Sequence, residues 1–140
     1  MAENGAKPIR LGMVGGGTGA FIGQVHRIAS RIDGDFELVA GALSSRPEVA
    51  KESGKNLGLA EDRIYTSYEE MAKAEAARPD GIQAVSIVTP NHMHFGPTKA
   101  FLEAGIHVIC DKPITSSLDD ARKLTDIKPA NGAKFLLTHN

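Results

Sequence analysis

Short apolar runs alternate along the whole chain with segments of helical periodicity. The apolar runs, which read as strands, cover residues 9–14, 36–43, 64–65, 84–88, 107–110 and 135–138. After the first run, one helical face carries Phe21, Val25, Ile28, Ala29 and Ile32. This alternation predicts an α/β fold, with a mainly parallel sheet and helices on both of its faces.

Local signals mark the boundaries of several helices. Ser67 with Glu70 and Ser117 with Asp120 have the spacing of capping boxes at helix N-termini. A further helix is expected over about 94–104, because a glycine follows it. With right-handed crossovers, six strands favour the doubly wound Rossmann order 3-2-1-4-5-6.

Composition narrows the class of protein. The chain has 140 residues, of which 41% are hydrophobic and 24% charged, as in one ordinary domain. A formal net charge of −1 argues against a nucleic-acid partner. Cys110 is the one cysteine, so no intrachain disulfide can form, and its place in a strand is typical of a small core residue. No run approaches the length of a membrane span, and no apolar leader is present, so a cytoplasmic protein is expected.

A glycine-rich loop, Gly15-Gly16-Gly17-Thr18-Gly19-Ala20, lies between the first strand and the first helix. Gly15, Gly17 and Ala20 satisfy the dinucleotide-binding pattern G-x-G-x-x-G/A, in which glycine allows a tight turn and close approach of a pyrophosphate. The helix N-terminus then offers free N–H groups to the anion. Gly23 is an alternative closing glycine, and a plain turn is the alternative interpretation of the loop.

The end of the second strand bears on the choice of cofactor. NAD-binding domains carry an acidic residue there that binds the ribose hydroxyls, whereas this chain has Ser44, Ser45 and Arg46. Hydroxyls and a guanidinium can bind a 2′-phosphate. NADP is therefore favoured and NAD is the alternative; Arg46 as an ordinary surface residue is the competing interpretation.

Two further motifs follow later strands, at the carboxyl edge of the sheet where ligands of such folds gather. They are Thr89-Pro90-Asn91-His92-Met93-His94 and Asp111-Lys112-Pro113. The His92 and His94 pair has no further ligand at a suitable spacing, so no metal site is expected.

In order along the chain, these motifs resemble those of the Gfo/Idh/MocA oxidoreductases, the family of glucose-fructose oxidoreductase and inositol dehydrogenase. The matching segments are the glycine loop with His26, Thr89-Pro90-Asn91 with His94, Ala104–Val108, Asp111-Lys112-Pro113, and His139 with Asn140. Asp111 departs from the usual glutamate and keeps the charge with a shorter reach. His26 has two interpretations of equal weight, packing of the first helix or a functional role.

The resemblance implies a cofactor lying across these loops, with Lys112 as the catalytic residue beside the nicotinamide and the substrate. With the glycine loop, the implied cofactor-binding residues are Gly15, Gly17, Thr18, Gly19, Ala20, Phe21, Ile22, Ser44, Ser45, Arg46, Thr89, Pro90, Asn91, His94, Asp111, Lys112, Pro113 and Asn140. It also implies a second domain for substrate and oligomer contacts, absent from these 140 residues, so that the chain alone turns over little or no substrate.

Three functions are therefore open. The first is the cofactor domain of an NAD(P)-dependent oxidoreductase acting on a sugar, cyclitol or related polyol. An NAD-dependent glycosidase of the same family is a close variant. The third is a stand-alone dinucleotide-binding sensor, which would have no need of Lys112 beside the nicotinamide.

Overall fold

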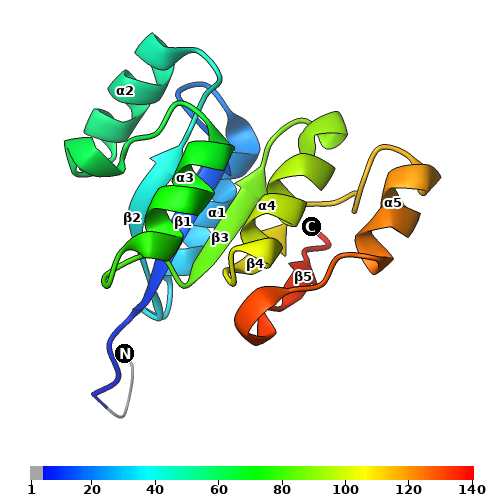
Figure 1. Ribbon diagram of the computed structural model, residues 1–140. Helices are drawn as coiled ribbons and strands as arrows, with labels where there is room; N and C mark the ends of the chain where they lie inside the picture. Colours follow the sequence, from blue (N-terminus) through cyan, green and yellow to red (C-terminus); the bar gives the residue numbers. More distant parts are fainter. Residues whose placement is uncertain (1–4) are drawn as a thin grey trace.

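The computed structural model describes residues 5–140 and contains a parallel sheet of five strands in the order β2-β1-β3-β4-β5 (Figure 1). The strands are β1 (Ile9–Gly15), β2 (Phe36–Ala42), β3 (Ala84–Val88), β4 (His107–Cys110) and β5 (Phe135–Leu137). Each neighbouring pair is parallel, as the alternation of strands and helices predicts. All the carboxyl ends therefore meet at one edge of the sheet.

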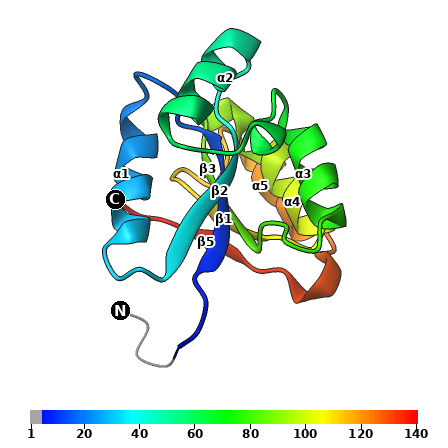
Figure 2. The same ribbon diagram turned by 90° about the vertical axis from the view of Figure 1, so that its left-hand side faces the viewer.

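Helices connect successive strands and cover the two faces unequally. They are α1 (Phe21–Arg31), α2 (Pro47–Asn56), α3 (Tyr68–Ala77), α4 (Phe95–Glu103) and α5 (Leu118–Thr125), with short 3₁₀ turns at Glu61–Arg63, Asn91–Met93 and Ala130–Gly132. Figure 2 shows α1 on one side of the sheet and α3 and α4 on the other, with the C-terminus beside α1. Among the described residues, no helix is long and apolar enough to cross a membrane.

The number of strands differs from the prediction. The expected strand at 64–65 forms only a single parallel bridge, between Ile64 and Gly41 of β2. The two residues are too few for a ladder, because a 3₁₀ turn precedes them and Ser67 begins the cap of α3. The other five strands lie in the predicted relative order.

In both predicted capping boxes the serine side chain caps the helix, as expected. The hydroxyl of Ser67 accepts a hydrogen bond of 3.2 Å from the Glu70 amide at the start of α3. The hydroxyl of Ser117 accepts one of 3.1 Å from the Asp120 amide at the start of α5. Each bond satisfies one of the unpaired amides at a helix N-terminus, which fixes where the helix begins.

The core lies mainly between the sheet and α3 with α4. Met71, Val85, Ile87 and Phe101 are fully buried there. A smaller cluster, built from Met13, Leu43, Leu59 and Val88, is packed against Ile22 of α1. These two clusters fix the sheet between its helices and hold the strand ends in register.

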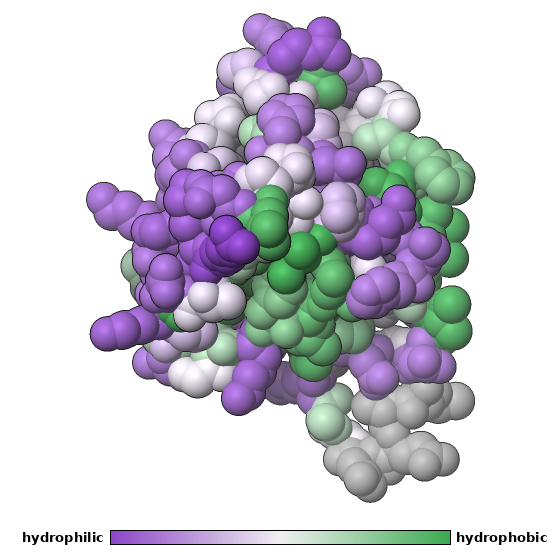
Figure 3. All heavy atoms as spheres, turned by 90° about the vertical axis from the view of Figure 1, so that its right-hand side faces the viewer, coloured by the Kyte–Doolittle hydropathy of each residue, from purple (hydrophilic) through white to green (hydrophobic). Residues whose placement is uncertain are grey.

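Much of the apolar face predicted for α1 is exposed, although Val25 and Ala29 line a cavity between α1 and the sheet. Phe21, Ile28 and Ile32 are 78%, 49% and 74% exposed, and Gly23 is the buried residue of the helix. The helix packs closely on the glycine loop through Gly23, because a Cβ at this position would collide with the Cα of Gly16. Hydrophobic atoms gather over the middle of the face shown in Figure 3. On the outer strand β5, Leu136 is 53% exposed.

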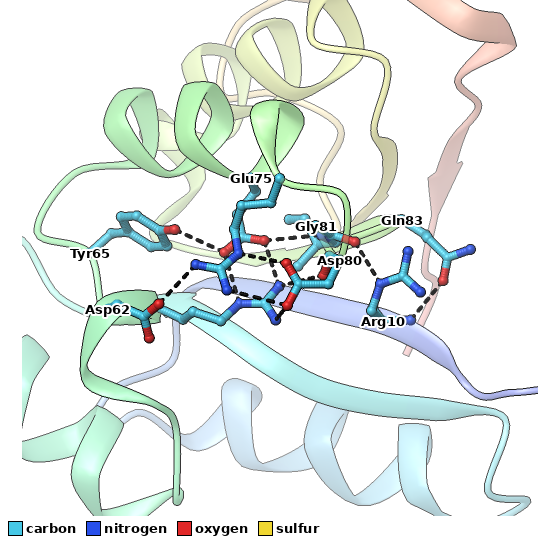
Figure 4. A network of polar contacts seen from close by, with 10 residues as sticks. Arg10, Asp62, Tyr65, Glu75, Asp80, Gly81 and Gln83 are labelled. Carbon is cyan, nitrogen blue, oxygen red and sulfur yellow. Dashed lines mark hydrogen bonds and ion pairs between the residues drawn. The ribbon is translucent and has the colours of Figure 1, made fainter.

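A buried polar network joins α3 to the segments on either side of it (Figure 4). The carboxylate of Glu75 accepts hydrogen bonds from the guanidinium of Arg63, the hydroxyl of Tyr65 and the amide of Ile82. The Glu75 side chain is fully buried and the Arg63 side chain is 9% exposed. The network therefore ties the 61–66 segment and the start of β3 to the end of α3.

Candidate functional site: a dinucleotide cavity at the carboxyl edge

A cavity of about 450 Å³ opens at the carboxyl edge of the sheet, within the range of small-molecule sites. Its lining comes from the loop after β1, the end of β2, the start of α3 and the end of β3. The lining residues are Val14, Gly15, Gly16, Gly17, Thr18, Ala20, Ala42, Leu43, Ser44, Ser45, Arg46, Val49, Thr66, Ser67, Tyr68, Glu69, Val88, Thr89, Pro90 and Met93.

The glycine loop is folded tightly under the N-terminus of α1. Gly15, Gly16 and Gly19 have φ values of 82°, 74° and 87°, which other residues rarely adopt. Gly17 donates to the Leu43 carbonyl at 3.0 Å, and a Cβ on Gly17 would lie 2.8 Å from the same oxygen. Gly17 therefore allows the loop to pack on the end of β2, while Gly23 allows α1 to pack closely on Gly16 of the loop.

The loop leaves N–H groups available where an anion would bind. The Thr18 amide donates to the hydroxyl of Ser53 at 2.9 Å, which fixes the loop against α2. Within residues 5–140, the amides of Gly19, Phe21 and Ile22 donate to no other group, and the N-cap residue Ala20 provides no side-chain cap. The first turn of α1 thus presents unpaired donors and the positive end of its dipole.

The end of β2 lines the opposite part of the cavity. Ser44 accepts a hydrogen bond of 3.1 Å from the Arg46 amide, which forms a tight turn before α2. The start of α3 lies close by, with Tyr68 and Glu69 on the lining. Burial, together with a hydrogen bond to Glu69, raises the pKa of the Tyr68 hydroxyl, so Tyr68 is neutral at neutral pH.

The segment after β3 is held by a buried histidine. The ring of His94 is 1% exposed, with Nδ1 at 2.6 Å from the Pro113 carbonyl oxygen and Nε2 at 3.0 Å from the Thr89 carbonyl oxygen. Carbonyls only accept, so a neutral imidazole donates to one of them and an imidazolium to both. His94 thereby links the loop after β3 to the loop after β4.

The segment after β4 is held from the other side of the sheet. Nε2 of His26 in α1 donates to the Asp111 carboxylate at 3.2 Å, and Nδ1 lies 2.8 Å from the Ser86 hydroxyl. The Thr138 hydroxyl also donates to Asp111, at 3.2 Å. Lys112, the next residue, is exposed at the carboxyl edge. His26 is therefore part of a polar link between α1, β3 and the loop after β4.

The structure divides the expected cofactor residues into two groups. The cavity lining includes Gly15, Gly17, Thr18, Ala20, Ser44, Ser45, Arg46, Thr89 and Pro90. It does not include Gly19, Phe21, Ile22, Asn91, His94, Asp111, Lys112, Pro113 or Asn140. Asn140 instead lines a second cavity of about 300 Å³ between α1 and the sheet. The second group lies on neighbouring parts of the loops, and its contact with a cofactor stays a prediction.

Sequence reasoning missed the contribution of α2 and α3. Ser53 supports the loop, and Tyr68 and Glu69 lie on the lining. Met93, in the 3₁₀ turn after β3, also lines the cavity and was not among the expected cofactor residues. One signal could have found Tyr68 and Glu69. The predicted strand order places 64–65 beside the second strand, so the residues that follow it must reach the same edge of the sheet.

A parallel sheet, a glycine loop before the first helix and a cavity above the strand ends together define a dinucleotide-binding Rossmann domain. The comparison with protein families gives the same class. The profile described as "Oxidoreductase family, NAD-binding Rossmann fold" (Gfo/Idh/MocA) matches residues 9–139. The chain belongs to this family.

Known relatives share the fold closely. An oxidoreductase of known crystal structure from Sinorhizobium meliloti is 59% identical, with a TM-score of 0.90 over 96% of this chain and 37% of that one. An inositol dehydrogenase homologue from Azotobacter vinelandii, complexed with NAD+, is 47% identical, with a TM-score of 0.88 over 95% of this chain and 34% of that one. A structure of an inositol dehydrogenase homologue from the same organism is complexed with NADH and myo-inositol.

Curated proteins show the same relationship. The uncharacterized oxidoreductase YfiI of Bacillus subtilis (strain 168) is 42% identical over 128 residues, which are 91% of this chain and 33% of the relative. The chain thus spans about a third of the length of the relatives that it matches.

Proposed function

We propose that this chain is the NAD(P)-binding domain of an oxidoreductase that acts on a sugar, cyclitol or related polyol. The observation that carries the proposal is the set of unpaired amides at Gly19, Phe21 and Ile22 beside a cavity of about 450 Å³. A pyrophosphate fits this set, because it needs several N–H donors and no side chain in the way. The complex of the 47% identical Azotobacter vinelandii homologue with NAD+ supports a dinucleotide as the ligand.

Lys112 is the proposed catalytic residue. It follows β4 directly and stands exposed at the edge where the cavity opens. A bound dinucleotide supplies the hydride acceptor or donor at its nicotinamide ring. The ammonium of Lys112 would orient a substrate hydroxyl and stabilise negative charge as it develops on that oxygen.

Substrate specificity is proposed at the level of a polyol. An inositol dehydrogenase homologue with NADH and myo-inositol bound is 47% identical to this chain. Hydride transfer requires the substrate to be held against the nicotinamide. Since the chain spans about a third of its relatives, we propose that the remaining contacts come from a second domain and that this chain alone has little or no turnover.

The cofactor is proposed to be NADP rather than NAD. Ser44, Ser45 and Arg46 line the cavity at the end of β2 and offer two hydroxyls and a guanidinium to a 2′-phosphate. One observation favours NAD instead. Glu69 lines the same cavity, and a carboxylate can accept hydrogen bonds from ribose hydroxyls while repelling a phosphate.

Calorimetric titration of the purified chain with NADP and with NAD tests both parts of the proposal. We expect both to bind, NADP more tightly, and Arg46→Ala to weaken NADP about tenfold with little effect on NAD. Arg31→Ala, at the far end of α1, is the matched control. Tighter binding of NAD, lost in Glu69→Gln, would overturn the NADP preference. Binding of neither cofactor would overturn the dinucleotide site itself.

A further inference from the structure

The Lys112 backbone lies between two residues that are each held by a histidine. Asp111, on its N-terminal side, accepts a hydrogen bond from His26. Pro113, on its C-terminal side, has its carbonyl oxygen 2.6 Å from Nδ1 of His94. The two histidines come from different helical segments, α1 and the start of α4, so they fix the Lys112 segment from two directions.

The link on the Asp111 side is buried, and two donors meet one oxygen of the Asp111 carboxylate. The His26 and Asp111 side chains are 10% and 9% exposed. A carboxylate only accepts, so Nε2 of His26 carries a proton, and Nδ1 is orientated by the hydroxyl of Ser86 at 2.8 Å. Thr138 provides a second donor to the same carboxylate oxygen. Because hydrogen bonds to charged groups are stronger than neutral ones, this side chain has little freedom.

The Asp111 main chain is held as well. Its amide donates to the Ile87 carbonyl of β3 at 3.0 Å. Backbone and side chain together anchor Asp111 to α1, β3 and the residue after β5. The position of the next Cα, that of Lys112, is therefore set by contacts that span the sheet.

The link on the Pro113 side joins the two loops of the carboxyl edge. His94 is 1% exposed and lies between the carbonyls of Pro113 and Thr89. Thr89 lines the cavity, whereas His94 does not. His94 is therefore placed to act through the backbone of its neighbours rather than by direct contact with a ligand.

We propose that His26 and His94 are positioning residues that hold Lys112 at the nicotinamide end of the cofactor site. This inference rests on the proposed function, and it changes the role expected for His94 from contacting the cofactor to orienting the loops around it. It also gives His26 a function in addition to packing. Both histidines are expected to matter for the nicotinamide half of the cofactor and not for the ADP half, which is bound at the glycine loop.

Binding of NAD+ and of ADP-ribose, which lacks the nicotinamide, separates the two halves in the chain as it stands. In His26→Leu and His94→Leu we expect NAD+ affinity to fall about tenfold and ADP-ribose affinity to change less than about twofold. His26→Gln should restore most of the NAD+ affinity, because the glutamine Nε2 can donate to Asp111. A melting curve for each variant establishes that it is folded.

Two further variants complete the experiment. His107→Leu is the matched control, since His107 accepts a hydrogen bond from the Lys134 amide at the opposite end of β4. It should alter neither affinity. Thr138→Val removes the second donor to Asp111 without touching a histidine, and should give a smaller loss confined to NAD+. If a histidine variant does not fold, Thr138→Val still tests the proposal.

The outcomes are distinct. Equal loss of NAD+ and ADP-ribose in the folded histidine variants, or no loss of either, would overturn the positioning role and leave the dinucleotide site standing. Failure of the unsubstituted chain to bind either compound would overturn the proposed function itself.

Discussion

Arg63 and Glu75 form a buried ion pair in which two guanidinium nitrogens meet the two carboxylate oxygens, Nε to Oε1 at 3.1 Å and a terminal nitrogen to Oε2 at 2.6 Å. The same carboxylate accepts from Tyr65 and from the Ile82 amide (Figure 4). Glu75 is thus the centre of contacts between α3 and the segments just before and after it in the chain.

Removal of this carboxylate is expected to destabilise the fold strongly. Glu75→Leu removes the buried partner of the Arg63 cation and leaves it only the carbonyl and carboxylate of Asp80, at 3.1 and 3.7 Å. The free energy of unfolding should therefore fall by about 3–5 kcal/mol. Urea unfolding monitored by circular dichroism measures the change. The double variant Arg63→Met with Glu75→Leu should lose less than Glu75→Leu alone.

An exposed pair provides the control. Asp119→Asn removes the ion pair with Lys123 on α5, where both side chains are more than half exposed. Its cost should stay below about 1 kcal/mol. Comparable costs for Asp119→Asn and Glu75→Leu would contradict the importance assigned to the buried pair.

The hydroxyl of Tyr65 should ionise late. Burial, and then its hydrogen bond to Glu75, raise the pKa of Tyr65 to about 12, against about 10 for free tyrosine. The folded state therefore holds this proton more tightly than the unfolded state. Its contribution to stability is complete below pH ~10 and is lost as the pH rises through about 12. Ultraviolet titration should show a late step that Tyr65→Phe removes; a single step near pH 10 for both tyrosines would be inconsistent with this environment.

The thiol of Cys110 should resist alkylation in the folded chain. Burial, with a smaller effect of the Asp111 carboxylate, raises the pKa of Cys110 to about 12, and the side chain is fully buried. Since the thiolate is the reactive form, iodoacetamide at pH 8 should label the native chain slowly. The same reaction in guanidinium chloride should be rapid and reach one label per chain. Rapid labelling of the native chain would show that this end of β4 opens.

The contact between α1 and the glycine loop should tolerate no added side chain. Gly23→Ala would normally favour a helix, but its methyl group collides with the Cα of Gly16. We expect a net loss of at least about 1 kcal/mol in stability, with weaker NAD+ binding because the loop must shift. Gln24→Ala, at the exposed neighbouring position, is the control and should be neutral or slightly stabilising. An increase in stability for Gly23→Ala would mean that the loop and helix are farther apart than described.

Much of the fold follows from local signals in the sequence. The serine caps at Ser67 and Ser117 act over three residues, so their effect can be predicted without knowledge of the rest of the chain. The five longer apolar runs form the five strands. The run at 64–65 could not be judged in the same way, because whether two residues make a strand depends on the contacts around them.

Other features depend on which residues of separate elements meet in the fold. The apolar stripe of α1 predicts a helix correctly, but periodicity cannot tell which residue of the helix makes the closest contact. Here Gly23 packs against Gly16 of the glycine loop, while much of the stripe stays exposed. The Arg63–Glu75 pair joins residues on two elements and has no local pattern. The contacts of His26 also have no local signal in the sequence, because Ser86 and Asp111 lie 60 and 85 residues away along the chain.

The single bridge between Gly41 and Ile64 also bears on whether copies of the chain associate with one another. β2 is an outer strand, and a long unpaired strand edge invites another chain to add to the sheet. The segment that contains Ile64 lies along this edge, and the Glu75 network fastens it there. The segment does not form a sixth strand, but it covers part of the outer edge of β2 and so opposes strand addition and aggregation.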